Sequence, residues 1–166
     1  MARVDTQLVT HLDSANTYAN YEREFDDRIY RRFIDVTPCL THVQTYTHIS
    51  ETDLHFFLSH LNVDDIPNPI NGFNDTRIHL YCHNQETFNR MRTLYRQRAI
   101  YKVFLENRLQ FNLCQSQLEL VNEFMQQSRI DSPERNRWVE VATILLDQMS
   151  NSFKDHMDAQ LSVEAE

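Results

Sequence analysis

The chain has 166 residues, a formal net charge of −8, and the apolar (41%) and charged (24%) fractions of an ordinary globular protein. The single glycine, Gly72, excludes glycine-rich phosphate loops, the GxGxxG dinucleotide turn and the GxSxG nucleophile elbow. The negative charge argues against a protein that coats nucleic acid through a general positive field.

Residues 7–34 carry apolar side chains at spacings of three and four, which predicts a helix with a bend. Its second stripe is aromatic, and aromatic residues are enriched at the centres of protein interfaces. We therefore expect this stripe to bind a protein partner or a second copy of the chain through Tyr18, Tyr21, Phe25, Ile29 and Phe33.

Two segments in the first half predict strands. Residues 39–49 are rich in threonine and other β-formers, and residues 76–83 alternate apolar and polar side chains. Between them, residues 50–61 have the pattern of a short amphipathic helix that begins with a capping box at Ser50. Residues 62–75 hold two prolines and Gly72, so they predict a long loop that is a candidate functional segment.

From residue 85 onward the pattern predicts helix to the end of the chain. Ser132-Pro133 is a typical helix start within this region, with proline at the first helical position. We predict a single helix-rich domain over residues 1–157, followed by an acidic frayed tail over 158–166. The fold class expected is α+β and mainly helical: about five helices with a small two-stranded β element, or alternatively an all-α bundle.

One pair of short motifs has the residue types of a zinc site. Cys39-x-x-His42 and His79-x-x-Cys82 resemble two half-sites in mirror order. Residues three apart in a strand point to opposite faces, so His79 and Cys82 cannot both hold one ion in a regular strand. The four residues are weak candidates, and we predict neither a metal site nor a cofactor.

A basic segment and a polar strand face are candidates for nucleic-acid or acidic-partner binding. The basic segment, residues 90–108, lies between acidic flanks that can pair with it. It carries six cations: the binding candidates Arg90, Arg92, Arg96, Arg98 and Lys102, and also Arg108. The strand face would present Arg77, His79, Tyr81 and His83, and outward polar residues are also ordinary on a one-sided sheet.

No serine, cysteine, histidine or carboxylate lies in a recognised catalytic spacing. We therefore predict a non-enzymatic interaction, assembly or regulatory protein. A nucleic-acid-associated protein is the first alternative, and a zinc-binding protein the second.

The expected location and state of the chain follow from smaller signals. The odd count of three cysteines suggests reduced thiols, and no apolar stretch reaches the length of a membrane span. The first residues lack the apolar run of a signal peptide. We expect an intracellular protein, cytoplasmic or nuclear, that forms homo-oligomers or binds a protein partner.

Overall fold

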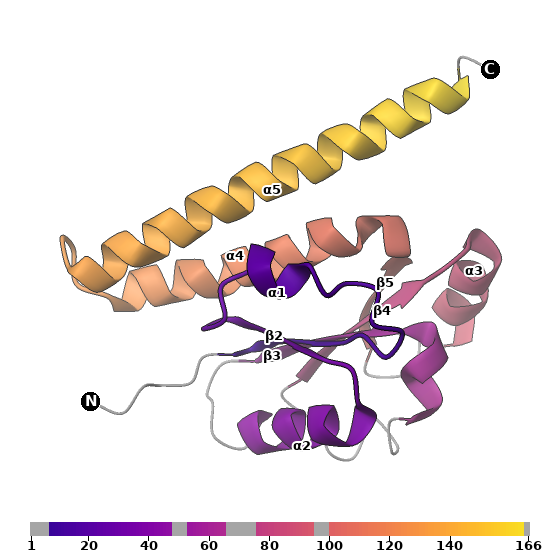
Figure 1. Cartoon of the computed structure of the whole chain (residues 1–166), viewed down its shortest axis with the longest axis horizontal. Coiled ribbons are helices and arrows are strands. Elements are labelled where there is room, and N and C mark those ends of the chain that lie inside the picture. The colour runs from indigo at the N-terminus through magenta and orange to yellow at the C-terminus, as the bar shows by residue number, and fades with distance from the viewer. Residues whose placement is uncertain (1–6, 48–52, 66–75, 95–99, 165–166) are drawn as a thin grey trace. The chain divides into compact units, whose positions relative to one another are not determined.

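A computed structural model describes residues 7–47, 53–65, 76–94 and 100–164. The chain forms two compact units, residues 1–106 and 107–166. The first unit is built on a sheet (Figure 1), and the second is a pair of long helices. The prediction of one domain over 1–157 with a frayed tail over 158–166 stays a prediction.

The sheet of the first unit has five parallel strands within the described residues, in the order β2-β1-β3-β4-β5. The chain runs from β1 to the edge strand β2 and then crosses back over β1 to reach β3. This is the strand order of doubly wound folds of the flavodoxin type. The strands are β1 (Val9–Leu12), β2 (Tyr30–Phe33), β3 (Leu54–Ser59), β4 (Thr76–Cys82) and β5 (Ile100–Leu105).

The sequence-based fold class is therefore wrong. The described residues contain five α-helices and a five-stranded parallel sheet, so the chain is neither mainly helical with a two-stranded element nor an all-α bundle. Parallel strands covered on both faces read as continuous apolar runs, without the alternation that marks a one-sided strand. In β3 all six residues are buried, which is why its sequence matched a helix pattern equally well.

The predicted helix over 7–34 is also wrong, because this segment forms β1, a loop, the short helix α1 (Tyr21–Glu24) and β2. The loop after β1 is stabilised by the side chain of Asp13, whose two carboxylate oxygens accept the backbone amides of Thr17 and Tyr18. Asn16 takes a left-handed conformation there (φ 53°), which asparagine tolerates better than most residues.

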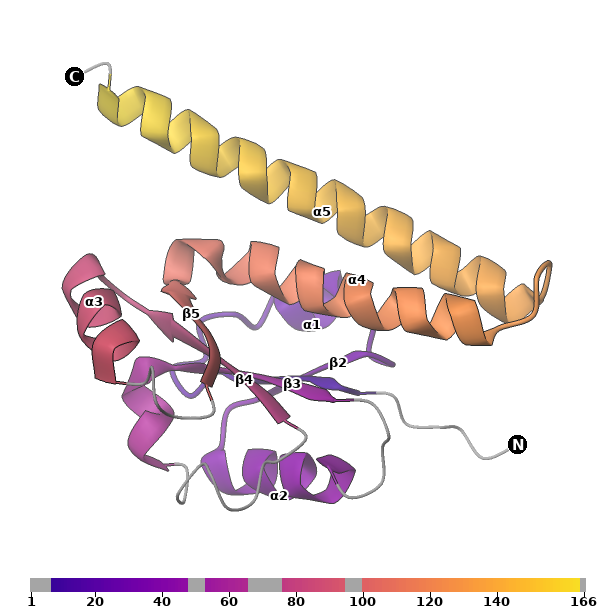
Figure 2. The same ribbon diagram turned by 180° about the vertical axis from the view of Figure 1, so that it is seen from behind.

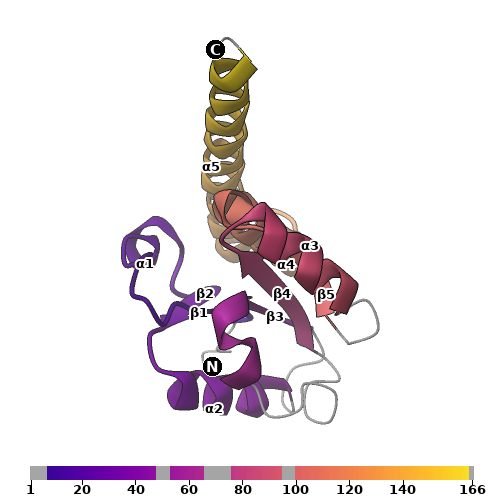
Figure 3. The same cartoon turned by 90° about the vertical axis from the view of Figure 1, so that its right-hand side faces the viewer.

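Residues 39–49 were predicted as a strand, but they belong to helix α2 (Val36–Thr47). Cys39 and Val43, four residues apart, are both fully buried, and the helix packs on the side of the sheet formed by β1, β2 and β3. Figures 1 and 3 show α2 along one face of the sheet, with α1 on the opposite side.

The strand predicted over 76–83 from its alternating apolar and polar residues is confirmed as β4. The predicted helix over 50–61 is instead β3 followed by a 3₁₀ helix, η1 (His60–Asp65); Ser50 and most of the expected loop over 62–75 lie outside the described residues. The helix expected from residue 85 is interrupted, because α3 (Gln85–Leu94) ends before β5 begins.

The second unit contains α4 (Leu109–Gln127) and α5 (Pro133–Glu164), joined by a short turn (Figure 2). The predicted helix start at Ser132-Pro133 is confirmed: the Ser132 hydroxyl accepts the backbone amide of Arg135 at 3.2 Å. Trp138 on α5 packs on Phe124 of α4, with ring centroids 5.0 Å apart. Among the described helices, none combines the length and apolar character needed to cross a membrane.

Candidate functional site at the carboxyl edge of the sheet

The strands of the first unit all run in one direction, so their carboxyl ends share one edge of the sheet. In doubly wound folds this edge, at the point where the strand order reverses, is where ligands bind. The reversal lies between β1 and β3. At or just after the strand ends, the sequence places Asp13 (β1), Ser59 (β3), His83 (β4) and Glu106 (β5).

Three of these residues form a continuous hydrogen-bonded chain across neighbouring strands. The Nδ1 atom of His83 lies 2.5 Å from Oε2 of Glu106, and its Nε2 atom lies 3.3 Å from Oγ of Ser59. With the proton on Nδ1 donated to the carboxylate, Nε2 is left to accept the serine hydroxyl. The Ser59 oxygen also accepts the backbone amide of Leu61 at 3.2 Å, which fixes its position.

A tyrosine and a second histidine extend this cluster, which we call the edge site (Tyr18, Ser59, His60, His83 and Glu106). The Tyr18 hydroxyl donates to Oε1 of Glu106, so both oxygens of that carboxylate are occupied. Burial, together with the hydrogen bond and charge of Glu106, raises the pKa of Tyr18, which keeps the phenol protonated as a donor.

His60 lies beside His83, with ring centroids 5.0 Å apart. Burial lowers the pKa of His60, and the charge of His83 lowers it further, so this ring is neutral at pH 7. Its Nδ1 atom is buried and has no hydrogen-bond partner among the described residues. A buried polar atom of this kind is one that a bound ligand can satisfy.

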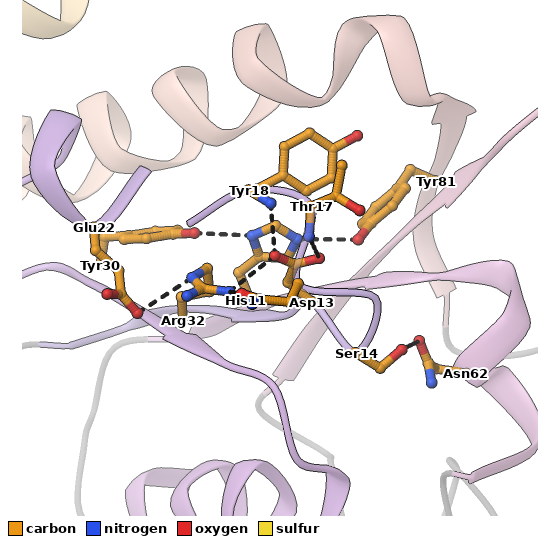
Figure 4. Close-up of polar contacts among 11 residues, drawn as sticks. His11, Asp13, Ser14, Thr17, Tyr18, Glu22, Tyr30, Arg32, Asn62 and Tyr81 are labelled. Carbon is orange, nitrogen blue, oxygen red and sulfur yellow. Dashed lines mark hydrogen bonds and ion pairs between the residues drawn. The ribbon is translucent and has the colours of Figure 1, made fainter. Parts of the chain in front are cut away.

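A second polar network is formed by side chains of β1, β2 and β4 (Figure 4). His11 of β1 is fully buried, and its two ring nitrogens contact the hydroxyls of Tyr30 on β2 (2.8 Å) and Tyr81 on β4 (3.0 Å). Burial lowers the pKa of His11 to about 4. A neutral ring donates through one nitrogen and accepts through the other, so both tyrosines can be satisfied.

Asp13 is the residue directly after β1. Its carboxylate accepts two backbone amides and pairs with the guanidinium of Arg32 at 3.0 Å, with side-chain exposures of 2% for Asp13 and 8% for Arg32. These partners occupy the carboxylate, so Asp13 holds the loop that carries Tyr18 (Figure 4). Asp13 thus fixes the backbone of Tyr18, whose hydroxyl contacts Glu106.

The residues of the predicted aromatic interface stripe do not lie on one helix in the structure. Tyr21, Phe25 and Ile29 are buried, and their rings pack with neighbours of the first unit: Tyr21 stacks on Tyr18, and Phe25 contacts Tyr30. Phe33 ends β2 and lies against His42. Their role as an interface stays a prediction, but they do not form one exposed helical stripe.

The four weak metal candidates do not meet. Cys39 and His42 lie on α2, whereas His79 and Cys82 lie on β4, where His79 stacks on Phe57 at 4.1 Å between ring centroids. Across the parts of the chain that the structure describes, no group of three or more histidine, cysteine or acidic residues is arranged to hold a metal ion. Burial raises the pKa of the Cys39 thiol to about 12 and that of Cys82 to about 11, so both are protonated thiols at pH 7.

The predicted basic helix over 90–108 is divided. Arg90 and Arg92 lie on α3, Lys102 lies on β5, and Arg96 and Arg98 fall outside the described residues. Of the polar residues predicted to line one face of β4, His79 and Tyr81 are buried. These two rings are therefore not exposed for stacking on nucleobases.

Sequence reasoning missed Ser59, His60 and Glu106 as site residues. Each lies at or just after the end of a strand that was read as helix. The signal that points to them is a polar residue at or directly after the carboxyl end of a parallel strand. This signal can be used only when the strands and their order in the sheet are known.

No family model, no curated protein sequence and no solved structure matches this chain. The class that its first unit defines is a doubly wound parallel α/β fold, with a serine, a histidine and a glutamate aligned at the carboxyl edge.

Proposed function

We propose that the first unit is a small-molecule enzyme domain that uses His83 as a general acid–base group. The observation that carries the proposal is the 2.5 Å contact between Nδ1 of His83 and the Glu106 carboxylate, at the edge where doubly wound folds bind ligands. A carboxylate at Nδ1 fixes the tautomer and the orientation of a catalytic imidazole.

The surroundings of His83 support this role. The His83 side chain is 40% exposed and that of Glu106 is 28% exposed, so the ring is held by its partner yet open to a ligand. Arg90 is near enough for its charge to act on His60, and an anionic group on a ligand would be favoured beside it. The unpartnered Nδ1 of His60 offers a further polar contact.

The test is the rate at which diethyl pyrocarbonate modifies each histidine, resolved by peptide mass spectrometry. The reagent attacks the unprotonated nitrogen of an imidazole, so it reports the basicity and access of Nε2. We expect His83 to react fastest among the histidines of the described residues. Glu106→Gln should slow its reaction about tenfold, because removing a charge-assisted hydrogen bond has a cost of roughly 1.5 kcal/mol.

His156 on α5 is the control, since it belongs to the second unit and is not a residue of the edge site; its rate should not change in Glu106→Gln. Equal reactivity of His83 and His156 in the wild-type protein would contradict the acid–base role. So would a His83 rate that is insensitive to Glu106→Gln.

An interaction or assembly role is a second candidate, and one observation favours it. α5 exposes a series of large apolar side chains at helical spacing: Val139, Leu146, Phe153, Met157 and Leu161. A protein partner or a second copy could cover them. The nucleic-acid and zinc alternatives gain no support from the described residues, and an intracellular location remains a prediction.

A further inference from the structure

The order of atoms in the edge site is that of a nucleophile, a base and an orienting acid. The Ser59 hydroxyl contacts Nε2 of His83, and the opposite ring nitrogen, Nδ1, contacts Glu106. A serine hydroxyl is a weak nucleophile unless an adjacent base accepts its proton, and this arrangement supplies one. The same sequence of contacts defines the serine–histidine–acid triad, which is recognised by geometry and has arisen on unrelated folds.

The local fold favours such a role for Ser59. It is the last residue of β3 and is followed directly by η1. The serine therefore lies at the carboxyl edge of the sheet, between a strand and a helical turn. The amide of Leu61 holds Oγ from one side, and the hydroxyl proton remains available for His83. Glu106 is held in turn by Tyr18.

We propose that Ser59 is the nucleophile of an acyl-transfer reaction on carboxylic esters, with His83 as its base and Glu106 as a positioning residue. This inference rests on the proposed acid–base role of His83. In the first step a bond forms between Oγ of Ser59 and the acyl carbon, and the ester C–O bond breaks. The serine proton passes to Nε2 of His83 and from there to the departing alcohol.

In the second step a water molecule attacks the acyl-serine and gives its proton to His83. The bond between the acyl carbon and Oγ breaks, the carboxylic acid leaves, and the proton returns to Ser59. No oxidant or further reactant is needed. The ester chemistry follows from the neutral hydroxyl nucleophile and its single imidazole base, which are suited to carbonyl carbon.

The direct test is covalent labelling of the full-length protein with a fluorophosphonate, which reacts with activated serines and releases fluoride. Peptide mass spectrometry of the wild-type protein should place the label on Ser59. His83→Gln should lower the labelling rate at least a hundredfold, within the usual contribution of a general base. Ser14→Ala is the matched control, because Ser14 is an exposed serine that donates to Asn62, and its loss should leave the rate unchanged.

The position of the label in the wild-type protein does not depend on whether a variant folds. Absence of label on Ser59, or a label on other serines at the same rate, would overturn the inference. If His83 reacts fastest with diethyl pyrocarbonate while Ser59 stays unlabelled, the nucleophile is refuted and the acid–base role stands. If His83 is also slow, both proposals fail.

Glu106→Gln gives a readout that a purely structural role would not move. It should change the pH dependence of Ser59 labelling, with circular dichroism unchanged. A pH profile identical to that of the wild-type protein would overturn the assignment of Glu106.

Hydrolysis of p-nitrophenyl acetate by the wild-type protein should show a burst of one p-nitrophenol per chain, followed by slower turnover.

Discussion

Nδ1 of His11 lies 2.8 Å from the hydroxyl oxygen of Tyr30, in a part of the sheet where the histidine is fully buried. The contact joins β1 to β2, and the second ring nitrogen joins β1 to Tyr81 on β4. A buried imidazole that spans three strands is stable only while it is neutral, so this network links the fold of the first unit to pH.

The first prediction concerns acid stability. Above pH 6.5 His11 is neutral in both states, and the folded state keeps its full stability. As the pH falls below 6.5, the unfolded chain takes up a proton that the folded His11 does not bind until about pH 4. The unfolding free energy should therefore fall by roughly 3 kcal/mol over this range. Burial also lowers the pKa of His55, to about 4, and that of His79, which adds to the loss.

Urea unfolding at pH 7.5 and pH 4.5 measures this loss. His11→Gln keeps a donor and an acceptor near the two tyrosines but removes the titrating group. Its stability should depend less on pH than that of the wild-type protein. An unchanged difference between the two pH values would show that His11 does not carry the effect.

The second prediction compares two ion pairs. Arg32→Leu leaves the buried carboxylate of Asp13 without its cation, which should lower the unfolding free energy by about 3–5 kcal/mol. Arg28→Leu breaks a pair with Asp26 whose side chains are 33% and 21% exposed, and should lower it by about 0–1 kcal/mol. Denaturant titrations give both values, and similar losses in the two variants would contradict the structural role assigned to Asp13.

The third prediction concerns Tyr18. Tyr18→Phe removes the hydrogen bond to Glu106 while it keeps the ring that stacks on Tyr21. The Ser59 labelling rate should fall about tenfold to a hundredfold, the range of one hydrogen bond to a charged group (roughly 1.5–3 kcal/mol). Tyr101→Phe is the control, because Tyr101 is exposed on β5 and contacts Arg77 and His79 rather than the edge site. Equal Ser59 labelling rates in the two variants would contradict a role for the Tyr18 hydroxyl in holding Glu106.

The fourth prediction separates a core from a surface. Tyr21 is buried, so Tyr21→Glu should lower the thermal midpoint sharply through burial of a charge. Phe153 on α5 is 58% exposed, so Phe153→Glu should leave the unfolding free energy within about 0.5 kcal/mol. If the second candidate function is correct, light scattering should show an oligomer that Phe153→Glu reduces to a monomer; a wild-type monomer without a partner would argue against self-association.

Part of this fold can be read from the sequence. The alternation over 76–83 predicts β4, and Ser132-Pro133 predicts the start of α5, because both signals are local. The threonine-rich segment over 39–49 has β propensity, but burial of Cys39 and Val43 against the sheet favours a helix. Tertiary packing overrides intrinsic propensity at such positions.

The candidate site depends on contacts that the sequence does not show. Ser59 and His83 are 24 residues apart, and His83 and Glu106 are 23 apart. Parallel pairing of β3, β4 and β5 brings them together, and no short motif records that pairing. His83 belongs to the predicted strand face, but its partners Ser59 and Glu106 lie at the ends of β3 and β5, in segments whose sequence pattern predicts helix.

The most direct measurement of the central claim is the protonation pattern of the His83 ring, from long-range ¹H–¹⁵N NMR spectra of the wild-type protein and Glu106→Gln. We expect the neutral His83 ring to carry its proton on Nδ1, with a strongly downfield Nδ1–H signal that is lost in Glu106→Gln. A neutral ring with its proton on Nε2, or a spectrum that Glu106→Gln leaves unchanged, would contradict a histidine oriented by Glu106 for acid–base chemistry.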